Sequence, residues 1–89
     1  MRGVIWKQVC ERDLVRMIGR GKNREKFLDV VFVLKSQGRL PIQHRPHKLS
    51  GKYEGLWECH IESNWLLIYK VTEKEVILAR TGTHADLFE

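Results

Sequence analysis

Two strand-like segments separated by only two residues place the strongest constraint on the fold of this chain. Residues 56–62 and 65–71 are rich in apolar and aromatic side chains, and only Ser63 and Asn64 lie between them. A connection this short joins antiparallel strands, because parallel strands need a long crossover. A third predicted strand, 76–81, follows a polar turn, so the carboxy-terminal half is predicted to be an antiparallel meander. The first segment also alternates in polarity, with Trp57, Cys59 and Ile61 on one face and Glu58, His60 and Glu62 on the other.

The amino-terminal half has helical periodicity instead. After a short predicted strand at residues 4–6, two apolar stripes recur at the spacing of a helix face: Cys10, Leu14, Met17 and Ile18, then Phe27, Val30, Val31 and Leu34. Gly19 is suited to end the first helix and Asn23 to cap the second, which ends near Gln37-Gly38 before Pro41. We therefore predict a single α+β domain over residues 1–89. Two N-terminal helices pack on a small antiparallel sheet of about three to four strands, giving a two-layer fold.

Basic residues outnumber acidic ones and indicate an anionic partner. The chain has 16 Lys and Arg against 11 Asp and Glu, a net charge of +5 with neutral histidines. This balance suits a nucleic acid, whose phosphates release counterions when they are neutralised, and it also suits an acidic protein. Cys10 and Cys59 are far apart and no signal-peptide pattern is present, which favours a reducing compartment. No apolar run is long enough to span a membrane, so we expect a cytoplasmic protein.

Three polar residues of the carboxy-terminal half carry the chemistry of greatest interest. His60 lies on the polar face of its strand, and an imidazole can give or take a proton near neutral pH. Arg80 ends the third strand, where alternation puts it on the face of Val76 and Leu78, and His84 follows shortly after it. A guanidinium can bind phosphate with two hydrogen bonds. Two plainer interpretations stay open: His60 is structural or solvated, and Arg80 forms a surface salt bridge with Glu58 or Glu62.

The segment 44–48 adds two histidines, an arginine and a lysine in a loop that contains Pro41 and Pro46. Loops beside a rigid sheet are favoured places for binding chemistry, although a solvated basic loop is the plainer interpretation. Metal and thiol chemistry are not expected. Cys59 and His60 are adjacent in a strand and point to opposite faces, so they can share neither a metal ion nor a nucleophilic dyad.

Five blocks of the sequence together resemble a known family. They are residues 40–41, 47–51, 57–62, 65–70 and 80–88. In this combination they resemble the YafQ branch of the RelE-type toxins, which are the toxin halves of bacterial type II toxin–antitoxin pairs. The pairing of the block around Cys59 and His60 with the block 80–88 is the most specific feature. The match is close from Leu40 to Phe88, and the helical half before it is similar only in pattern.

The resemblance implies a RelE-like fold and a ribosome-dependent messenger-RNA endonuclease that uses neither a metal nor an organic cofactor. In that family the ribose 2′-hydroxyl attacks the neighbouring phosphate and leaves a cyclic phosphate. The reaction needs a proton acceptor, a proton donor and cations that face the phosphate. The family pattern carries over to catalytic positions at His47, His60, Arg80, His84 and Phe88, and we expect Trp65 and Lys48 to contact RNA. Within this set, His60 or His84 is expected to transfer protons with assistance from His47, Arg80 to hold the phosphate, and Phe88 and Trp65 to stack against RNA.

One position departs from the family. Most members carry an aspartate directly before the tryptophan, where this chain has Asn64. An amide exchanges no proton at neutral pH, so Asn64 can orient a histidine or a ribose hydroxyl but cannot act as acid or base. This departure supports an alternative, a catalytically weak toxin-like module that acts mainly in antitoxin binding and autoregulation. A third alternative, a plain basic nucleic-acid-binding domain, leaves the histidines unexplained.

Partners also follow from the resemblance. The antitoxin of such a pair is a flexible acidic chain that wraps around the toxin, and this basic chain suits such a ligand. Because antitoxins typically dimerise through a DNA-binding half, the resemblance implies an assembly of two toxins and two antitoxins. Operator DNA would be contacted only through the antitoxin. The ribosome and messenger RNA are the other expected partners, and no membrane is expected.

Overall fold

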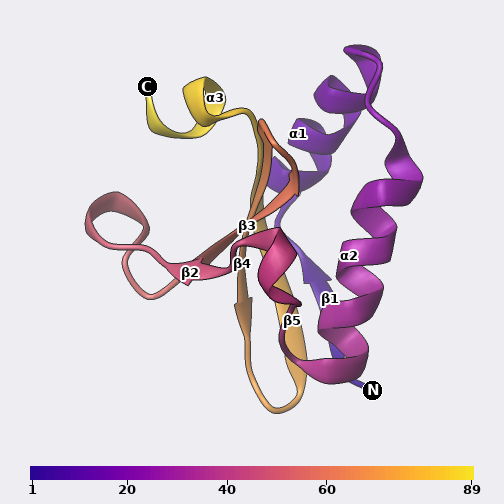
Figure 1. Cartoon of the computed structure of the whole chain (residues 1–89), viewed down its shortest axis with the longest axis vertical. Helices are drawn as coiled ribbons and strands as arrows, with labels where there is room; N and C mark the ends of the chain where they lie inside the picture. Colours follow the sequence, from indigo (N-terminus) through magenta and orange to yellow (C-terminus); the bar gives the residue numbers. More distant parts are fainter.

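The computed structural model describes all residues, 1–89, and places two helices on one face of a five-stranded sheet (Figure 1). The strands are β1 (Gly3–Trp6), β2 (His47–Lys48), β3 (Trp57–Glu62), β4 (Trp65–Val71) and β5 (Glu75–Gly82). The helices are α1 (Gln8–Gly19), α2 (Arg24–Gln37) and the short α3 (His84–Phe88), with 3₁₀ turns η1 (Ile42–His44) and η2 (Gly51–Tyr53). None of these helices is long and apolar enough to cross a membrane.

The sheet has the order β1-β5-β4-β3-β2. The predicted meander is confirmed, because β3, β4 and β5 are antiparallel neighbours and residues 63–64 form the turn between β3 and β4. The predicted strand at residues 4–6 is also confirmed, but it pairs in parallel with β5, with Val4 opposite Val76. The sheet is therefore mixed rather than antiparallel, and the long connection through the helices makes this parallel pairing possible. A fifth strand, β2, lies at the other edge, where the sequence indicated only a loop.

Helix α1 ends at Gly19 as predicted, and α2 begins and ends where its turn residues predict. At the start of α2, the side-chain oxygen of Asn23 accepts a hydrogen bond from the backbone N–H of Glu25. At its end, Gly38 has a φ of 75°, a left-handed conformation that glycine adopts without strain. The apolar stripes face the sheet, and the following members are buried: Cys10, Leu14 and Met17 of α1, and Phe27, Val30, Val31 and Leu34 of α2.

Two apolar clusters lie on opposite faces of the sheet. The larger one fills the space under α1 and α2, where Phe27 stacks between Trp6 and Trp65 with ring centroids 5.4 and 6.3 Å apart. The smaller one lies on the face away from these helices, which we call the open face. There Leu87 of α3 packs on Leu66 and Ile68 of β4, with Leu49, Tyr53 and Leu56 around them. Figure 1 shows α1 and α2 on one side of the sheet, and α3 and the arm that follows β2 on the other.

A bulge in β5 changes the face on which Arg80 lies. Leu78 is opposite Tyr69 of β4, but Arg80 is opposite Ile68, the very next residue, so Ala79 is an extra residue in the ladder. Such a bulge reverses the alternation of the side chains beyond it. The prediction that Arg80 shares the face of Leu78 is therefore wrong. Leu78 lies in the core under the helices, whereas Arg80 belongs to the open face.

A second bulge, in β3, places Glu62 on the helix side of the sheet instead of the open face. The register shifts between His60 and Glu62, so that Glu62 lies opposite the core residue Trp65. Glu62 was predicted to share the polar face of His60, and it lies instead on the helix side. There it accepts hydrogen bonds of 2.8 Å from both Lys22 and Lys26 and ties β3 to the start of α2.

We expect the protein to lose stability in acid because Glu62 loses its ion pairs with the two lysines when it is protonated. The two lysine ammonium groups lower the pKa of this carboxylate to about 2 from its ordinary 4.5. As the pH falls through this window, the unfolded chain takes up the proton before the folded chain does, so the stabilisation present above pH 4.5 is lost towards pH 2. Thermal midpoints measured from pH 6 to pH 2 should fall less for Glu62→Gln than for the wild type. Parallel curves for the two proteins would contradict this role of the carboxylate.

Candidate active site

The register of the sheet brings functional side chains to the open face in two neighbouring rows. Each row runs across β3, β4 and β5, with Glu58, Ile68 and Arg80 in the first and His60, Leu66 and Gly82 in the second. Adjacent strands are about 4.8 Å apart, so side chains on β3 and β5 in one row start about 10 Å from each other. His60 and Arg80 therefore flank the apolar strand β4 on one face of the molecule.

A buried carboxylate organises the histidines at the β3 side of this face. Glu58 is only 6% exposed, and its Oε1 lies 3.3 Å from Nε2 of His47 and 3.9 Å from Nε2 of His60. The other ring nitrogen, Nδ1, lies 3.0 Å from the carbonyl of Arg45 in His47 and 3.2 Å from the carbonyl of Ser63 in His60. A carbonyl only accepts, so each Nδ1 carries a hydrogen and each Nε2 is turned towards Glu58. Both imidazoles are thus oriented by two contacts each.

On the β5 side, Arg80 is held by a carboxylate from a helix. Asp13 of α1 accepts hydrogen bonds from Nε of Arg80 at 2.7 Å and from Nη2 at 3.2 Å. These bonds raise the pKa of the guanidinium above its ordinary value, so its charge is secure. Neither Glu58 nor Glu62 is the partner of Arg80. The salt bridge considered from the sequence exists, but with a residue 67 positions away.

The short helix α3 presents two further residues above the open face. Its start is fixed by a capping box, in which Thr83 and Asp86 bond each other's backbone N–H groups. Asp86 also accepts two hydrogen bonds, of 2.7 and 3.2 Å, from the guanidinium of Arg20 in α1. Together these bonds hold the pKa of Asp86 far below its usual range. The rings of His84 and Phe88 lie side by side on the exposed surface of this helix, with centroids 4.9 Å apart.

Two contacts join α3 to the rest of the open face. Phe88 meets the ring of Tyr53 edge to face at 5.4 Å, and the hydroxyl of Tyr53 donates a 2.8 Å hydrogen bond to the carbonyl of Leu87. At the other end, the side-chain oxygen of Asn64 accepts a 3.2 Å hydrogen bond from the backbone N–H of His84. Asn64 thus orients the residue that begins α3 by bonding its backbone rather than its imidazole.

The open face therefore holds an apolar floor bordered by titratable and cationic groups. Leu66, Ile68 and Leu87 form the floor along β4. His47 and His60 lie on the β3 side and Arg80 lies on the β5 side. Helix α3 follows directly after the carboxy-terminal end of β5. No hydrogen bond or ion pair joins His60, Arg80 or His84 to one another, so they share a face rather than a bonded network.

One protein-family model matches residues 3–89, which is nearly the whole chain. Its description is the bacterial YafQ toxin of type II toxin–antitoxin systems. The chain belongs to the YafQ toxin family.

Individual YafQ-type proteins agree with this assignment in sequence and in structure. The mRNA interferase toxin YafQ of Escherichia coli is 39% identical over 66 residues, which are 74% of this chain and 71% of that protein. The E. coli DinJ–YafQ complex contains a chain that superposes with a TM-score of 0.90 at 31% identity, with all of both chains covered. A copper-bound mutant toxin from Helicobacter pylori also superposes with a TM-score of 0.90 at 31% identity, over 99% of this chain and 100% of that one. The predicted RelE/YafQ-like fold is confirmed by these likenesses.

Two of the RNA-contacting positions expected for a YafQ-type toxin do not lie on the open face. Trp65 is 0% exposed and packs under the helices, where its indole N–H donates a 2.9 Å hydrogen bond to the hydroxyl of Thr81. The expectation that Trp65 stacks against RNA is therefore wrong for this structure. Lys48 lies opposite Trp57, whereas His47 lies opposite Glu58, so Lys48 is on the other face from the histidines. Alternation along β2 separates these two neighbours.

The sequence patterns missed the two carboxylates that contact the histidines and Arg80, which are Glu58 and Asp13. Glu58 appeared only as a possible salt-bridge partner, although its position two residues before His60 in a strand was a usable signal. Asp13 gave one weaker signal, because it lies within the apolar stripe of its helix between Cys10 and Leu14. Its pairing with Arg80 depends on the fold and has no local signature.

The cysteines lie away from the open face. Cys10 and Cys59 are both free and buried in the core, and burial raises the pKa of each thiol to about 12. Cys59 points into the core while His60 lies on the open face, as alternation predicted. No three His, Cys, Asp or Glu side chains are grouped as metal ligands.

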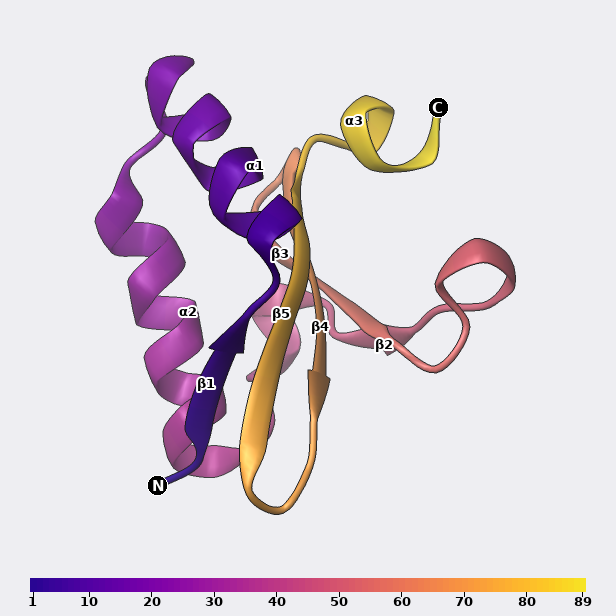
Figure 2. The same cartoon turned by 180° about the vertical axis from the view of Figure 1, so that it is seen from behind.

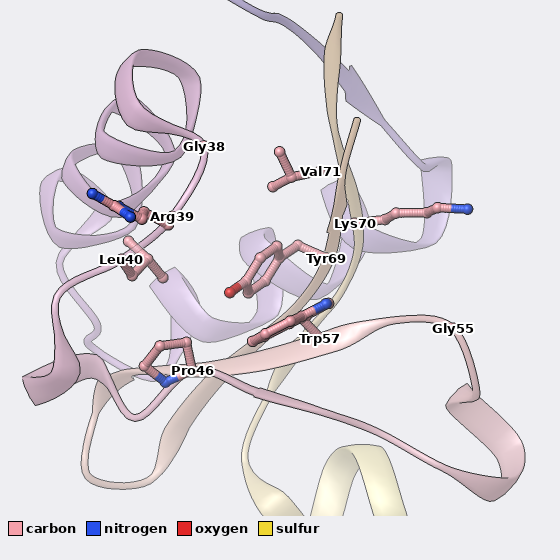
Figure 3. Close-up of a pocket in the computed structure, with 9 residues that line it drawn as sticks. All are labelled: Gly38, Arg39, Leu40, Pro46, Gly55, Trp57, Tyr69, Lys70 and Val71. Atoms are coloured by element: carbon pink, nitrogen blue, oxygen red, sulfur yellow. The ribbon is translucent and has the colours of Figure 1, made fainter. Parts of the chain in front are cut away.

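A cavity on the helix side of the sheet also lies away from the histidines. It encloses about 350 Å³ where α2 ends against β3 and β4. Figure 3 shows Trp57 and Tyr69 side by side in this cavity, with Leu40 and Pro46 opposite them and Lys70 directed away from it. Trp57 and Tyr69 lie on the helix side of the sheet together with Cys59. This cavity is therefore separate from the open face.

Proposed function

We propose that this chain is an mRNA interferase, an endoribonuclease toxin that cleaves translated messages on the ribosome and so inhibits translation. The observation that carries the proposal is the single face that holds His60, Arg80 and the exposed ring pair of α3. General acid–base groups, a cation and a stacking ring are the parts that phosphodiester cleavage requires. The similar E. coli protein named mRNA interferase toxin YafQ supports this choice of substrate.

In the proposed reaction, the ribose 2′-oxygen attacks the neighbouring phosphorus and the bond from phosphorus to the 5′-oxygen breaks. One histidine, His60 or His84, accepts the proton of the 2′-hydroxyl, and the other donates a proton to the leaving 5′-oxygen. The products are a 2′,3′-cyclic phosphate and a free 5′-hydroxyl. Arg80 faces the negative charge that gathers on the phosphate, and Phe88 stacks against a base.

In this proposal, Glu58 fixes the orientation of the imidazole rings of His47 and His60. It contacts Nε2 of both His47 and His60 from a buried position. A rigid imidazole loses less orientational freedom when the substrate binds, which is the basis of catalysis by positioning. His47 accordingly assists His60 rather than acting alone. No step of this reaction uses a metal ion or an organic cofactor.

The proposal is tested by primer extension on translated messages in a reconstituted translation reaction. The purified chain should produce cuts within translated codons, and each upstream fragment should end in a cyclic phosphate. Toxin that has been treated with a chelator and desalted before the assay should cut at the same rate. Intact messages at toxin concentrations comparable to the ribosome concentration would overturn the proposed function.

Asn64 tests the competing interpretation, a catalytically weak module that mainly binds its antitoxin. Because the amide oxygen already bonds the N–H of His84, a carboxylate at this position would make the same contact. We expect Asn64→Asp to change the cleavage rate by less than about threefold, since the hydrogen bond is retained. Asn64→Ala, which removes the bond, should lower the rate by more than that. A gain of tenfold or more for Asn64→Asp, measured by the same primer-extension assay, would instead identify the natural chain as a weakened enzyme.

The partners of this toxin are proposed on the same basis. The structurally similar E. coli YafQ is found in a complex with DinJ, and we infer a cognate antitoxin for this chain. An acidic antitoxin would complement its net charge of +5, and a complex of two toxins with two antitoxins would bind operator DNA through the antitoxin. Because the proposed partners are translating ribosomes and messenger RNA, we propose that the active toxin acts in the cytoplasm.

A further inference from the structure

A buried carboxylate on α1 is the most heavily bonded polar group in the protein. Asp13 is 0% exposed, yet it accepts four hydrogen bonds. Two come from Arg80 at 2.7 and 3.2 Å, one from Arg16 at 2.9 Å, and one from the backbone N–H of Thr81 at 3.2 Å. A buried carboxylate is tolerated only when it is fully paired in this way. The chemistry proposed above does not use Asp13, so its position needs another explanation.

The fold places Asp13 beside the part of the β5 edge that no strand pairs with. Strand β1 pairs with β5 only as far as Leu78, and Figure 2 shows α1 beginning beside β5 just past the end of β1. The edge at Arg80 and Thr81 therefore meets a helix instead of a strand. Asp13 takes the place of a strand neighbour by accepting the N–H of Thr81, and from the same position it reaches the guanidinium of Arg80.

The bonds to Asp13 use only part of the guanidinium. An arginine has five N–H donors, and Asp13 accepts from two of them, Nε and one on Nη2. Three donors are left, both on Nη1 and the second on Nη2. Because the guanidinium is planar and rigid, fixing Nε and Nη2 fixes the direction of the remaining donors as well. A side chain that otherwise samples many rotamers is held in one.

We propose that Asp13 is a positioning residue for Arg80: it holds the guanidinium so that its free N–H groups face the scissile phosphate. Asp13 itself never touches RNA, since it is wholly buried. This inference rests on the proposed function and adds a residue to it. A purely structural ion pair would affect stability and leave the chemical step unchanged, so the two interpretations differ in which quantity a substitution changes.

A double-mutant cycle separates the two interpretations. Asp13→Asn keeps the size of the side chain, but its amide nitrogen cannot accept from Arg80. We expect Asp13→Asn to lower kcat for cleavage at least tenfold with KM changed by less than threefold, and to have no further effect when Arg80 is already alanine. Arg16→Met is the matched control, because it removes the other cation of Asp13 without touching Arg80, and its kcat should stay within threefold of wild type. Equal losses from Asp13→Asn in the presence and absence of Arg80 would overturn the proposal.

An NMR measurement on Arg80 in the wild-type protein tests the proposal without a cleavage assay and without relying on the folding of a variant. In the wild-type protein, the NMR resonance of the Arg80 Nε–H should be protected from solvent exchange relative to that of the exposed Arg12. Asp13→Asn should abolish that protection. If the wild type cleaves no message, the proposed function fails while the NMR result still decides whether Asp13 fixes Arg80. Free exchange of the Arg80 Nε–H in the wild type would overturn the positioning role outright.

Discussion

Replacing His84 by alanine is expected to reduce cleavage of translated messages by at least about 100-fold, the loss typical of removing a general acid or base. The fold should be unaffected, because the imidazole is 66% exposed and its nearest charged partner is Glu89 at 3.8 Å. Alanine also favours the helical conformation of α3. The same substitution should therefore abolish growth arrest on induction in cells and leave antitoxin binding intact.

The controls for His84 come from the same short helix. His84→Gln keeps a polar side chain of similar size that exchanges no proton, so it should be as inactive as His84→Ala. Glu89→Ala removes the neighbouring carboxylate at the end of α3 and should keep the rate within about threefold, since its contact is solvent-exposed. If His84→Ala arrests growth as strongly as the wild type does, the catalytic assignment of His84 is wrong, and His60 with His47 would have to carry both proton transfers.

Replacing Trp65 by alanine is expected to lower the free energy of unfolding by about 3–5 kcal/mol. The indole is fully buried and stacks on Phe27, so its removal leaves a large cavity under the helices. It also leaves the hydroxyl of Thr81 without the indole N–H. This loss is a large share of the stability of a typical domain. Urea unfolding followed by circular dichroism measures it directly.

A conservative variant separates the two contributions of Trp65. Trp65→Phe keeps most of the volume and loses the hydrogen bond to Thr81, so we expect a smaller loss of about 1–2 kcal/mol. Reduced cleavage by Trp65→Ala would follow from unfolding and would say nothing about RNA contact. Only an unchanged urea midpoint together with lost cleavage would restore the stacking role that the sequence suggested for this residue.

The parts of the fold that local patterns determine were predictable. The two-residue turn at 63–64 requires the β3–β4 hairpin, and the caps at Asn23 and Gly38 mark the ends of α2. The parallel pairing of β1 with β5 was not predictable, because it joins segments about 70 residues apart and no local signal sets the order of strands. The two-residue strand β2 is too short to have a periodicity of its own.

The candidate site shows the same division between local and long-range information. Alternation correctly predicted that His60 and Cys59 point to opposite faces of the sheet, because no bulge lies between them. It failed for Arg80 and Glu62, since an extra residue in a strand is set by its pairing with the neighbouring strand. The resemblance to YafQ-type toxins supplied candidate residues for the site but said nothing of their burial. That is why Trp65 was assigned to RNA rather than to the core.

The extra residue in β5 means that the number of residues between Leu78 and Gly82 decides on which face of the sheet Arg80 lies. Removing one residue there would leave the amino-acid types of the site intact and rotate the guanidinium of Arg80 by half a turn, from the face of His60 into the apolar interior. We expect a small side chain in place of Ala79 to leave Arg80 on the open face as long as the spacing is kept. In comparing toxins of this kind, a gap at this point of an alignment therefore matters more than a change of residue.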